Sequence, residues 1–162
     1  LDKSIFPFGK DTLRLQFFTL DRNPSPNVFA SNWFKNDSDS IPLYLPGEML
    51  LIQAEAYVRK GDLVNGKVFL DRVLTKRPSQ DAFRIGASLD PYAGPMTQEA
   101  LLLEIYRNRC VELFMSGLKL SDSRRFRRPG PLDARPERKR NYFPYPQSEA
   151  LGNANTPPNP EI

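Results

Sequence analysis

Apolar residues recur at helical spacing in residues 49–77, the first of two long stretches without proline. Leu50, Ala54 and Tyr57 share one face of the predicted helix, and charged residues occupy the opposite face: Glu48, Glu55 and Arg59. Gly61 is suited to end this helix, and the Asp62 side chain to cap the next one. The second helix carries a further apolar set that ends before Pro78: Leu63, Leu70, Val73 and Leu74. The pattern predicts a helical hairpin over residues 47–78.

The spacing within this hairpin resembles a tetratricopeptide repeat. Seven positions sit at the distances of the 34-residue pattern: Leu50, Ala54, Tyr57, Gly66, Leu70, Val73 and Pro78. Two positions depart from it, because Gln53 replaces a leucine and Gly66 stands where alanine is commoner.

A second long helix is predicted from Thr97, as its cap, to about Ser116. Glu99 suits the positive end of the helix dipole. A wide apolar face is expected to pack in the core: Leu102, Ile105, Tyr106, Cys110, Leu113 and Phe114. Glu104, Arg107 and Asn108 are expected to lie away from that face.

Arg109 falls on the apolar side of this helix, where a guanidinium needs a partner because burial of an isolated charge is costly. Glu112 and Asp122 are the nearby carboxylates, so we expect a structural ionic network that joins a second helical hairpin around Gly117: Arg109, Glu112, Asp122 and Arg125. A paired-carboxylate site for glycoside hydrolysis is the catalytic alternative. The arginine close to each acid would keep both ionised, which favours the structural interpretation.

The two ends of the chain differ from the helical centre. Residues 1–42 are expected to form strands and loops, because Leu13–Phe17 alternates apolar and polar side chains and 21–27 is rich in turn residues. Residues 129–162 contain eight of the 16 prolines and are expected to form an irregular tail.

Composition removes several classes of function. The 162-residue chain has no histidine and one cysteine, which excludes Ser-His-Asp and Cys-His sites, imidazole-dependent zinc sites and an internal disulfide. We expect no catalytic residues, no metal and no cofactor. The mean hydropathy of −0.51 and short apolar runs give no membrane-spanning segment. The first residue is Leu1, so we expect the sequence to begin within a longer protein or after processing.

The net charge of +4 is concentrated near the C-terminal end. Residues 124–140 contain eight basic and two acidic side chains, a net charge of +6. Nucleic acid is an obvious partner for such a segment, but no recognition helix or phosphate-binding loop accompanies it. A solvated loop with some paired arginines is the preferred interpretation.

Residues 108–125 resemble the C-terminal signature of the SusD/RagB family of nutrient-binding outer-membrane lipoproteins, R-x-x-E-L-x-x-x-G-x-x-x-x-D-x-x-R. Its places are taken by Arg109, Glu112, Leu113, Gly117, Asp122 and Arg125. Residues 141–149 resemble the family's N-Y-L-P-I-P-x-S-E block, and residues 41–62 its approach to a repeat helix. Leu120 replaces an aromatic residue and Asn108 an acid.

The resemblance implies a mainly α fold of the SusD-like, α/α superhelix type. Tetratricopeptide-like helical hairpins would be joined by long irregular loops and a short strand region. The expected parts are a strand and loop region that ends a ligand-binding insertion (1–42), the repeat hairpins with the signature (43–128) and a proline-rich tail packing on the domain (129–162). Family members are much longer, so the missing N-terminal part of the same chain is an expected partner.

The resemblance also implies a function. SusD-like proteins are non-catalytic, bind glycans or other nutrients at the cell surface, and cover a SusC-like TonB-dependent transporter in the outer membrane. The lipid anchor would be an N-terminal cysteine not present in this sequence. The alternative is a tetratricopeptide-type protein-interaction scaffold that binds no sugar. A scaffold should carry further repeats, whereas this chain follows one repeat with the signature and the tail.

Sugar recognition needs exposed aromatic faces and a few polar groups. The candidates for carbohydrate binding are Asn32, Trp33, Phe34 and, more weakly, Tyr92. For Trp33 the preferred interpretation is an ordinary core residue, since large aromatics are mostly buried. The helical aromatics are expected to be core residues: Tyr57, Phe69, Tyr106 and Phe114.

Overall fold

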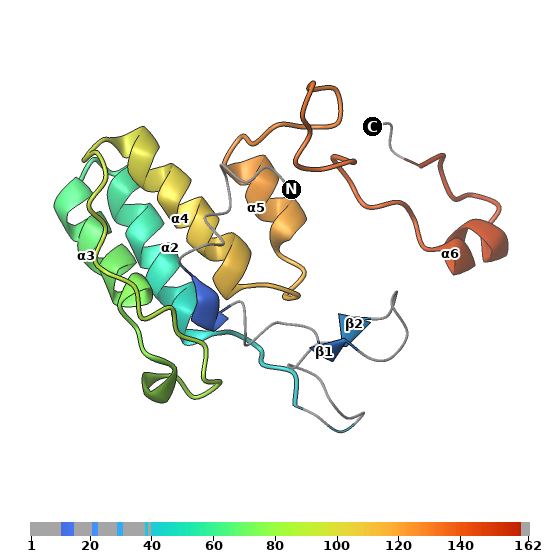
Figure 1. The fold of residues 1–162 in the computed structure, drawn as a ribbon. Coiled ribbons are helices and arrows are strands. Elements are labelled where there is room, and N and C mark those ends of the chain that lie inside the picture. The colour runs from blue at the N-terminus through green and yellow to red at the C-terminus, as the bar shows by residue number, and fades with distance from the viewer. Residues whose placement is uncertain (1–10, 15–20, 23–28, 31–37, 39, 160–162) are drawn as a thin grey trace. The chain divides into compact units, whose positions relative to one another are not determined.

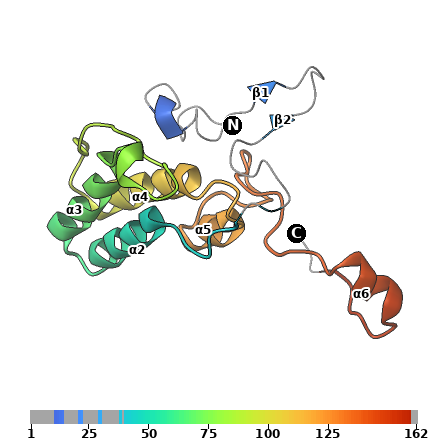
Figure 2. The ribbon, with the colours of Figure 1, turned by 90° about the horizontal axis from the view of Figure 1, so that it is seen from below.

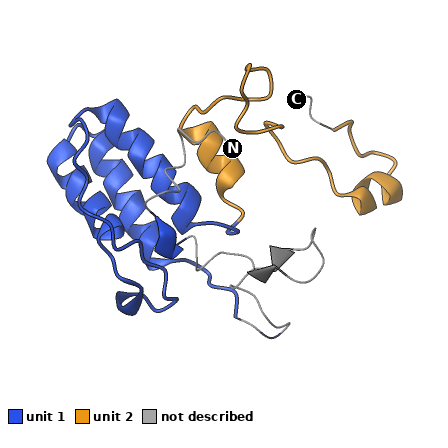
Figure 3. Ribbon diagram, viewed as in Figure 1, with its two compact units in different colours: residues 1–116 blue, residues 117–162 orange. Residues whose placement is uncertain are grey.

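The computed structural model describes residues 11–14, 21–22, 29–30, 38 and 40–159 (Figure 1). Its elements are β1 (Asp21–Arg22), β2 (Phe29–Ala30), α2 (Pro46–Arg59), α3 (Leu63–Leu74), the 3-10 turn η1 (Pro78–Gln80), α4 (Gln98–Glu112), α5 (Lys119–Arg125) and α6 (Gln147–Gly152). The chain divides into two compact units, residues 1–116 and 117–162 (Figure 3). The described part is mainly helical, as predicted.

Three helices form the body of the first unit. α2 packs on both α3 and α4, and α3 also contacts α4 (Figures 1 and 2). The fully buried apolar side chains come from all three helices and from the loop after η1: Leu51, Ala54, Val58, Leu70, Val73, Ile85, Leu101, Ile105 and Tyr106. These side chains supply the hydrophobic stabilisation of the unit.

The predicted hairpin over residues 47–78 is present as α2 and α3, and local signals set its turn. Gly61 has φ +86°, and the N–H of Asp62 donates to the carbonyl of Tyr57 at 3.0 Å. This left-handed termination favours glycine. The Asp62 carboxylate then accepts the N–H of Asn65 at 3.1 Å and caps α3, as predicted.

Gly66 is explained by the closeness of the two helices. A Cβ built on Gly66 would overlap Val58 Cγ2 and would lie 3.3 Å from the carbonyl oxygen of Ala54. The departure from the repeat pattern therefore allows α3 to approach α2.

The buried faces differ in detail from the predicted ones. In α2 the buried side chains include Leu51, Val58 and Glu55, while Leu50 and Tyr57 are half-buried. The Tyr57 ring stacks on Phe69 with centroids 5.4 Å apart, and both lie at the edge of the core. Glu55 was expected on the polar face but is buried. Arg59 Nε lies 2.7 Å from Glu55 Oε1, and this ion pair offsets the cost of burying the carboxylate.

The helix predicted from Thr97 is α4, which begins as predicted and ends earlier. Thr97 accepts the N–H of Ala100 at 3.2 Å, but α4 ends at Glu112 instead of about Ser116. Phe114, beyond the helix, is exposed, so this core prediction was wrong, whereas Cys110 is half-buried. Asn108 is buried, contrary to expectation, because its amide is satisfied by Glu104 and Arg14.

The N-terminal strand region is only partly described. Residues 12–14 form a helical turn, so the predicted strand over Leu13–Phe17 was wrong where the structure describes it. β1 and β2 pair antiparallel, with Asp21 opposite Ala30 and Arg22 opposite Phe29. Each of these strands has two residues.

The second unit contains α5, a loop over residues 126–146 and α6 (Figure 3). Asp122, Ser123 and Gly130 are its buried residues among those described. Arg138 holds the loop, because its guanidinium donates to the carbonyls of Arg128 and Pro129 and to the Asn141 side chain.

Candidate functional site

A group of charged side chains is buried in the first unit, and Glu112 of α4 lies at its centre. We call it the Glu112 cluster; its members are Asp11, Arg14, Lys76, Asp81, Asn108 and Glu112. The Glu112 side chain is 0% exposed and that of Arg14 is 2% exposed. Burial of charge is tolerated only with close partners, so the contacts within the cluster decide its stability.

Each carboxylate oxygen of Glu112 has a cationic partner. Arg14 Nη1 donates to Oε2 at 3.1 Å, and Lys76 Nζ contacts Oε1. Arg14 also donates through Nε to Asp11 Oδ2 at 2.7 Å and through Nη2 to Asn108 Oδ1 at 2.9 Å. One arginine from the N-terminal segment thus ties residues 11–14 to α4.

Lys76 joins the cluster to the loop after α3. Its Nζ donates to Asp81 Oδ2 at 2.7 Å. The other oxygen of Asp81 accepts the backbone N–H groups of Phe83 at 2.9 Å and Ile85 at 3.3 Å. Lys76 therefore neutralises charge on two carboxylates and fixes the loop to α4.

The start of α2 lies against the cluster. A Cβ built on Gly47 would be 2.6 Å from Glu112 Cγ and closer still to Oε1. Gly47 belongs to the first turn of α2, where unpaired N–H groups and the helix dipole favour nearby negative charge. The cluster has three carboxylates and two cations, so this helix end helps to balance its excess negative charge.

These contacts give the cluster a structural role. Both oxygens of Glu112 are engaged with cations and the side chain is closed to solvent, so it has no access to a substrate. Among the described residues, no group of three or more His, Cys, Asp or Glu side chains is arranged to hold a metal ion. No described helix has the length and apolar character needed to cross a membrane.

The four residues of the predicted ionic network lie in two different units. Arg109 and Glu112 are both buried in α4 of the first unit. Within the second unit, Arg125 Nη2 pairs with Asp122 Oδ1 at 2.7 Å. The described partners of Glu112 include Arg14 and Lys76, which sequence reasoning missed. The only local signal was the polar position of Arg14 between Leu13 and Leu15, which was interpreted as the solvent side of a strand.

Of the predicted carbohydrate-binding residues, Asn32, Trp33 and Phe34 lie outside the described residues. Tyr92 is described, and it contacts both α3 and its own loop. Its N–H donates to Asp71 Oδ1 at 2.7 Å, and its hydroxyl donates to the Pro95 carbonyl at 3.1 Å. The ring covers Gly94, where a Cβ would lie 2.8 Å from Tyr92 Cε2.

Burial raises the pKa of Tyr92 above its ordinary value of 10.0. The negative charge of Glu104 acts in the same direction, and Arg107 acts against it. Like an ordinary tyrosine, the phenol is neutral at physiological pH, and its hydroxyl donates to the Pro95 carbonyl. These contacts place Tyr92 as a support of the loop between η1 and α4.

Comparison with known proteins supplies one match. No protein-family model matches the chain, and none of the curated proteins matches it. A solved structure of a SusD superfamily protein from Bacteroides vulgatus ATCC 8482 is 30% identical over 49% of this chain, with a TM-score of 0.42. This chain resembles part of a SusD superfamily protein. The match spans 15% of the solved SusD superfamily chain.

Proposed function

We propose that this chain is part of a non-catalytic cell-surface protein that binds glycans and delivers oligosaccharide to a SusC-like TonB-dependent outer-membrane transporter. The observation that carries the proposal is the ordered set of SusD-like motifs at residues 41–62, 108–125 and 141–149. The protein would be held at the outer membrane by a lipidated N-terminal cysteine outside this sequence.

The geometry of the signature indicates that its motif residues stabilise the fold and do not contact a ligand. Glu112 is enclosed by Arg14 and Lys76, and Asp122 is paired with Arg125. Gly117 has φ +82° with open space around its Cβ position, so its backbone conformation is the reason for glycine. Binding would then depend on side chains other than these motif residues, and we propose Asn32, Trp33, Phe34 and, secondarily, Tyr92.

The proposed binding is tested by titrating the full chain with a panel of neutral and acidic oligosaccharides. Calorimetry reports binding, and the fluorescence of Trp33, the single tryptophan, reports whether the ligand lies near it. We expect a saturable signal with one class of sugar. The Trp33→Phe variant should lose the fluorescence signal and should bind the sugar more weakly in calorimetry. Heat of binding without a fluorescence change would indicate that the sugar binds away from Trp33.

Pulldown of the transporter tests the delivery step separately. The protein carrying this chain should retain a TonB-dependent transporter from solubilised outer membranes. Absence of binding to every sugar together with absence of the transporter would contradict the proposal.

A further inference from the structure

The second unit concentrates positive charge beside exposed aromatic rings. Residues 122–140 contain eight basic and three acidic side chains, a net charge of +5. Tyr142 and Phe143 follow directly and are 51% and 71% exposed. No role has been given to this surface so far.

The acidic side chains of this segment have local partners. Asp122 pairs with Arg125, and Glu137 accepts from Arg128 Nε at 2.8 Å. Asp133 accepts the backbone N–H of Gly130. Of the six other basic side chains, Arg138 is half-buried and five are exposed: Arg124, Arg127, Arg135, Lys139 and Arg140.

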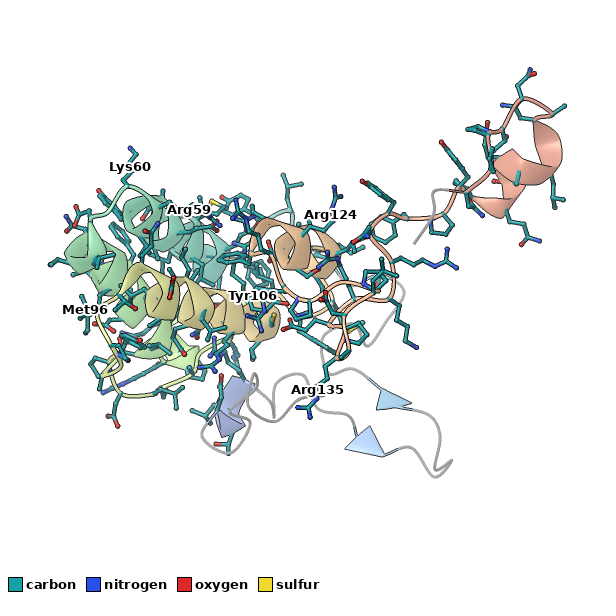
Figure 4. All side chains as sticks on the ribbon, turned by 90° about the horizontal axis from the view of Figure 1, so that it is seen from above. Arg59, Lys60, Met96, Tyr106, Arg124 and Arg135 are labelled. Carbon is teal, nitrogen blue, oxygen red and sulfur yellow. The ribbon has the colours of Figure 1, made fainter. Side chains whose placement is uncertain are left out.

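Arg124 brings charge and an aromatic ring together. Its guanidinium carbon lies 4.9 Å from the centroid of the Tyr142 ring, which joins α5 to the segment after the loop. Figure 4 shows Arg124 projecting from α5. Arg138 fixes the intervening loop through the carbonyls of Arg128 and Pro129 and through Asn141, so Tyr142 is held near α5.

Arg127 occupies a position that favours glycine. Its φ is +51°, and the N–H of Arg128 donates to the carbonyl of Ser123 at 2.8 Å, which is the hydrogen bond of a left-handed helix termination. An arginine there bears a conformational cost that glycine would not. Glycine would therefore suit this helix end better than arginine, and the Arg127 side chain is exposed.

We propose that Arg124, Arg127, Lys139, Arg140 and Tyr142 form a binding surface for acidic oligosaccharides, those that carry carboxylate or sulfate groups. The guanidinium and ammonium groups would pair with the anionic groups, and the exposed Tyr142 ring would contact the apolar face of a sugar ring. The inference rests on the proposed glycan-binding function and names its ligand class. Nucleic acid has similar charge and stacking needs, and the test below separates the two.

The test is calorimetric titration of the full chain with an oligogalacturonate, a neutral maltooligosaccharide of equal length and a single-stranded oligonucleotide. We expect the acidic sugar to bind at least tenfold more tightly than the neutral sugar, and its affinity to fall as salt rises. Arg124→Ala should weaken binding of the acidic sugar about tenfold, the size expected for loss of one charge-assisted hydrogen bond. Tyr142→Ala should also weaken it.

Two further variants complete the test, one as a control and one as a probe of Arg127. Lys60→Ala removes one exposed positive charge from the first unit and should leave the affinity unchanged (Figure 4). Arg127→Gly should weaken binding while the thermal midpoint stays the same or rises, which a purely structural role of Arg127 would not give.

The inference is overturned if Arg124→Ala and Tyr142→Ala bind the oligogalacturonate as the unaltered chain does. Equal affinity for the neutral sugar would also overturn it while leaving the proposed glycan binding intact. Equal or tighter binding of the oligonucleotide would assign the surface to nucleic acid. Absence of binding to any sugar would count against both proposals.

Discussion

Gly47 in the first turn of α2 lies directly against the side chain of Glu112 at the end of α4. A Cβ at Gly47 would stand 2.6 Å from Glu112 Cγ, far inside van der Waals contact. The two residues are far apart in sequence, yet the absence of a side chain at one allows the buried position of the other.

Gly47→Ala should destabilise the protein by about 1–3 kcal/mol, the usual cost of overpacking a filled core. The carboxylate of Glu112 would have to move away from Lys76 or Arg14 to make room. Urea denaturation measures the change. Gly152→Ala is the control, because nothing lies within 4 Å of its Cβ position. Helix propensity alone favours alanine in a helix, so a stabilised Gly47→Ala protein would contradict the close approach.

Arg14→Ala should cost about 3–5 kcal/mol, since it removes one of the cations that enclose the buried Glu112 carboxylate. The matched control is Lys67→Ala, which breaks the partly exposed pair with Asp71 and should cost about 0–1 kcal/mol. Combining Arg14→Ala with Glu112→Gln should cost less than the sum of the two single changes. Equal costs for Arg14→Ala and Lys67→Ala would show that the Arg14 contact does not form in solution.

Gly66→Ala should destabilise the α2–α3 hairpin by about 1–3 kcal/mol, because the new methyl group overlaps Val58 Cγ2. Val58→Ala removes that methyl group, so the double variant Gly66→Ala with Val58→Ala should be less destabilised than the sum of the single variants. The coupling is measured by a double-mutant cycle in urea. Strict additivity would place the two residues out of contact.

Tyr92 should titrate above its ordinary pKa of 10.0 in the folded protein. The folded state then holds this proton at a pH where the unfolded state has lost it, so the stabilising contribution is full below pH 10.0 and falls as pH rises above it. The difference in alkaline ultraviolet titration between the unaltered protein and Tyr92→Phe isolates this group. The stability of the Tyr92→Phe variant should also depend less on pH than that of the unaltered protein. A difference titration at or below 10.0 would contradict the buried setting.

The starts of α3 and α4 and the turn at Gly61 could be predicted from the sequence. Asp62 and Thr97 cap α3 and α4 through N–H groups three residues away, so the signal lies within one turn. Gly61 and Gly117 adopt positive φ values at the turns where glycine was expected. The family resemblance was also contained in short ordered motifs.

The polar part of the core could not be predicted in the same way. Helical periodicity assigned Glu55 and Asn108 to solvent, because a polar residue is exposed unless a partner pays the cost of its burial. Arg14 and Glu112 are 98 residues apart, and no spacing rule connects them. Residues 12–14 form a helical turn in which Arg14 contacts Asn108 of α4, whereas local alternation favoured a strand.

The sequence by itself determined the helical hairpin of α2 and α3, the residues at which α3 and α4 begin, and which protein family the chain resembles. These properties depend on interactions within a few residues or on short motifs. Only the tertiary structure decided which charges are buried and with which partners, and why Gly47 and Gly66 must lack side chains. Those outcomes require atoms from distant segments to meet, and the free energy of a buried charge is set by its neighbours in space.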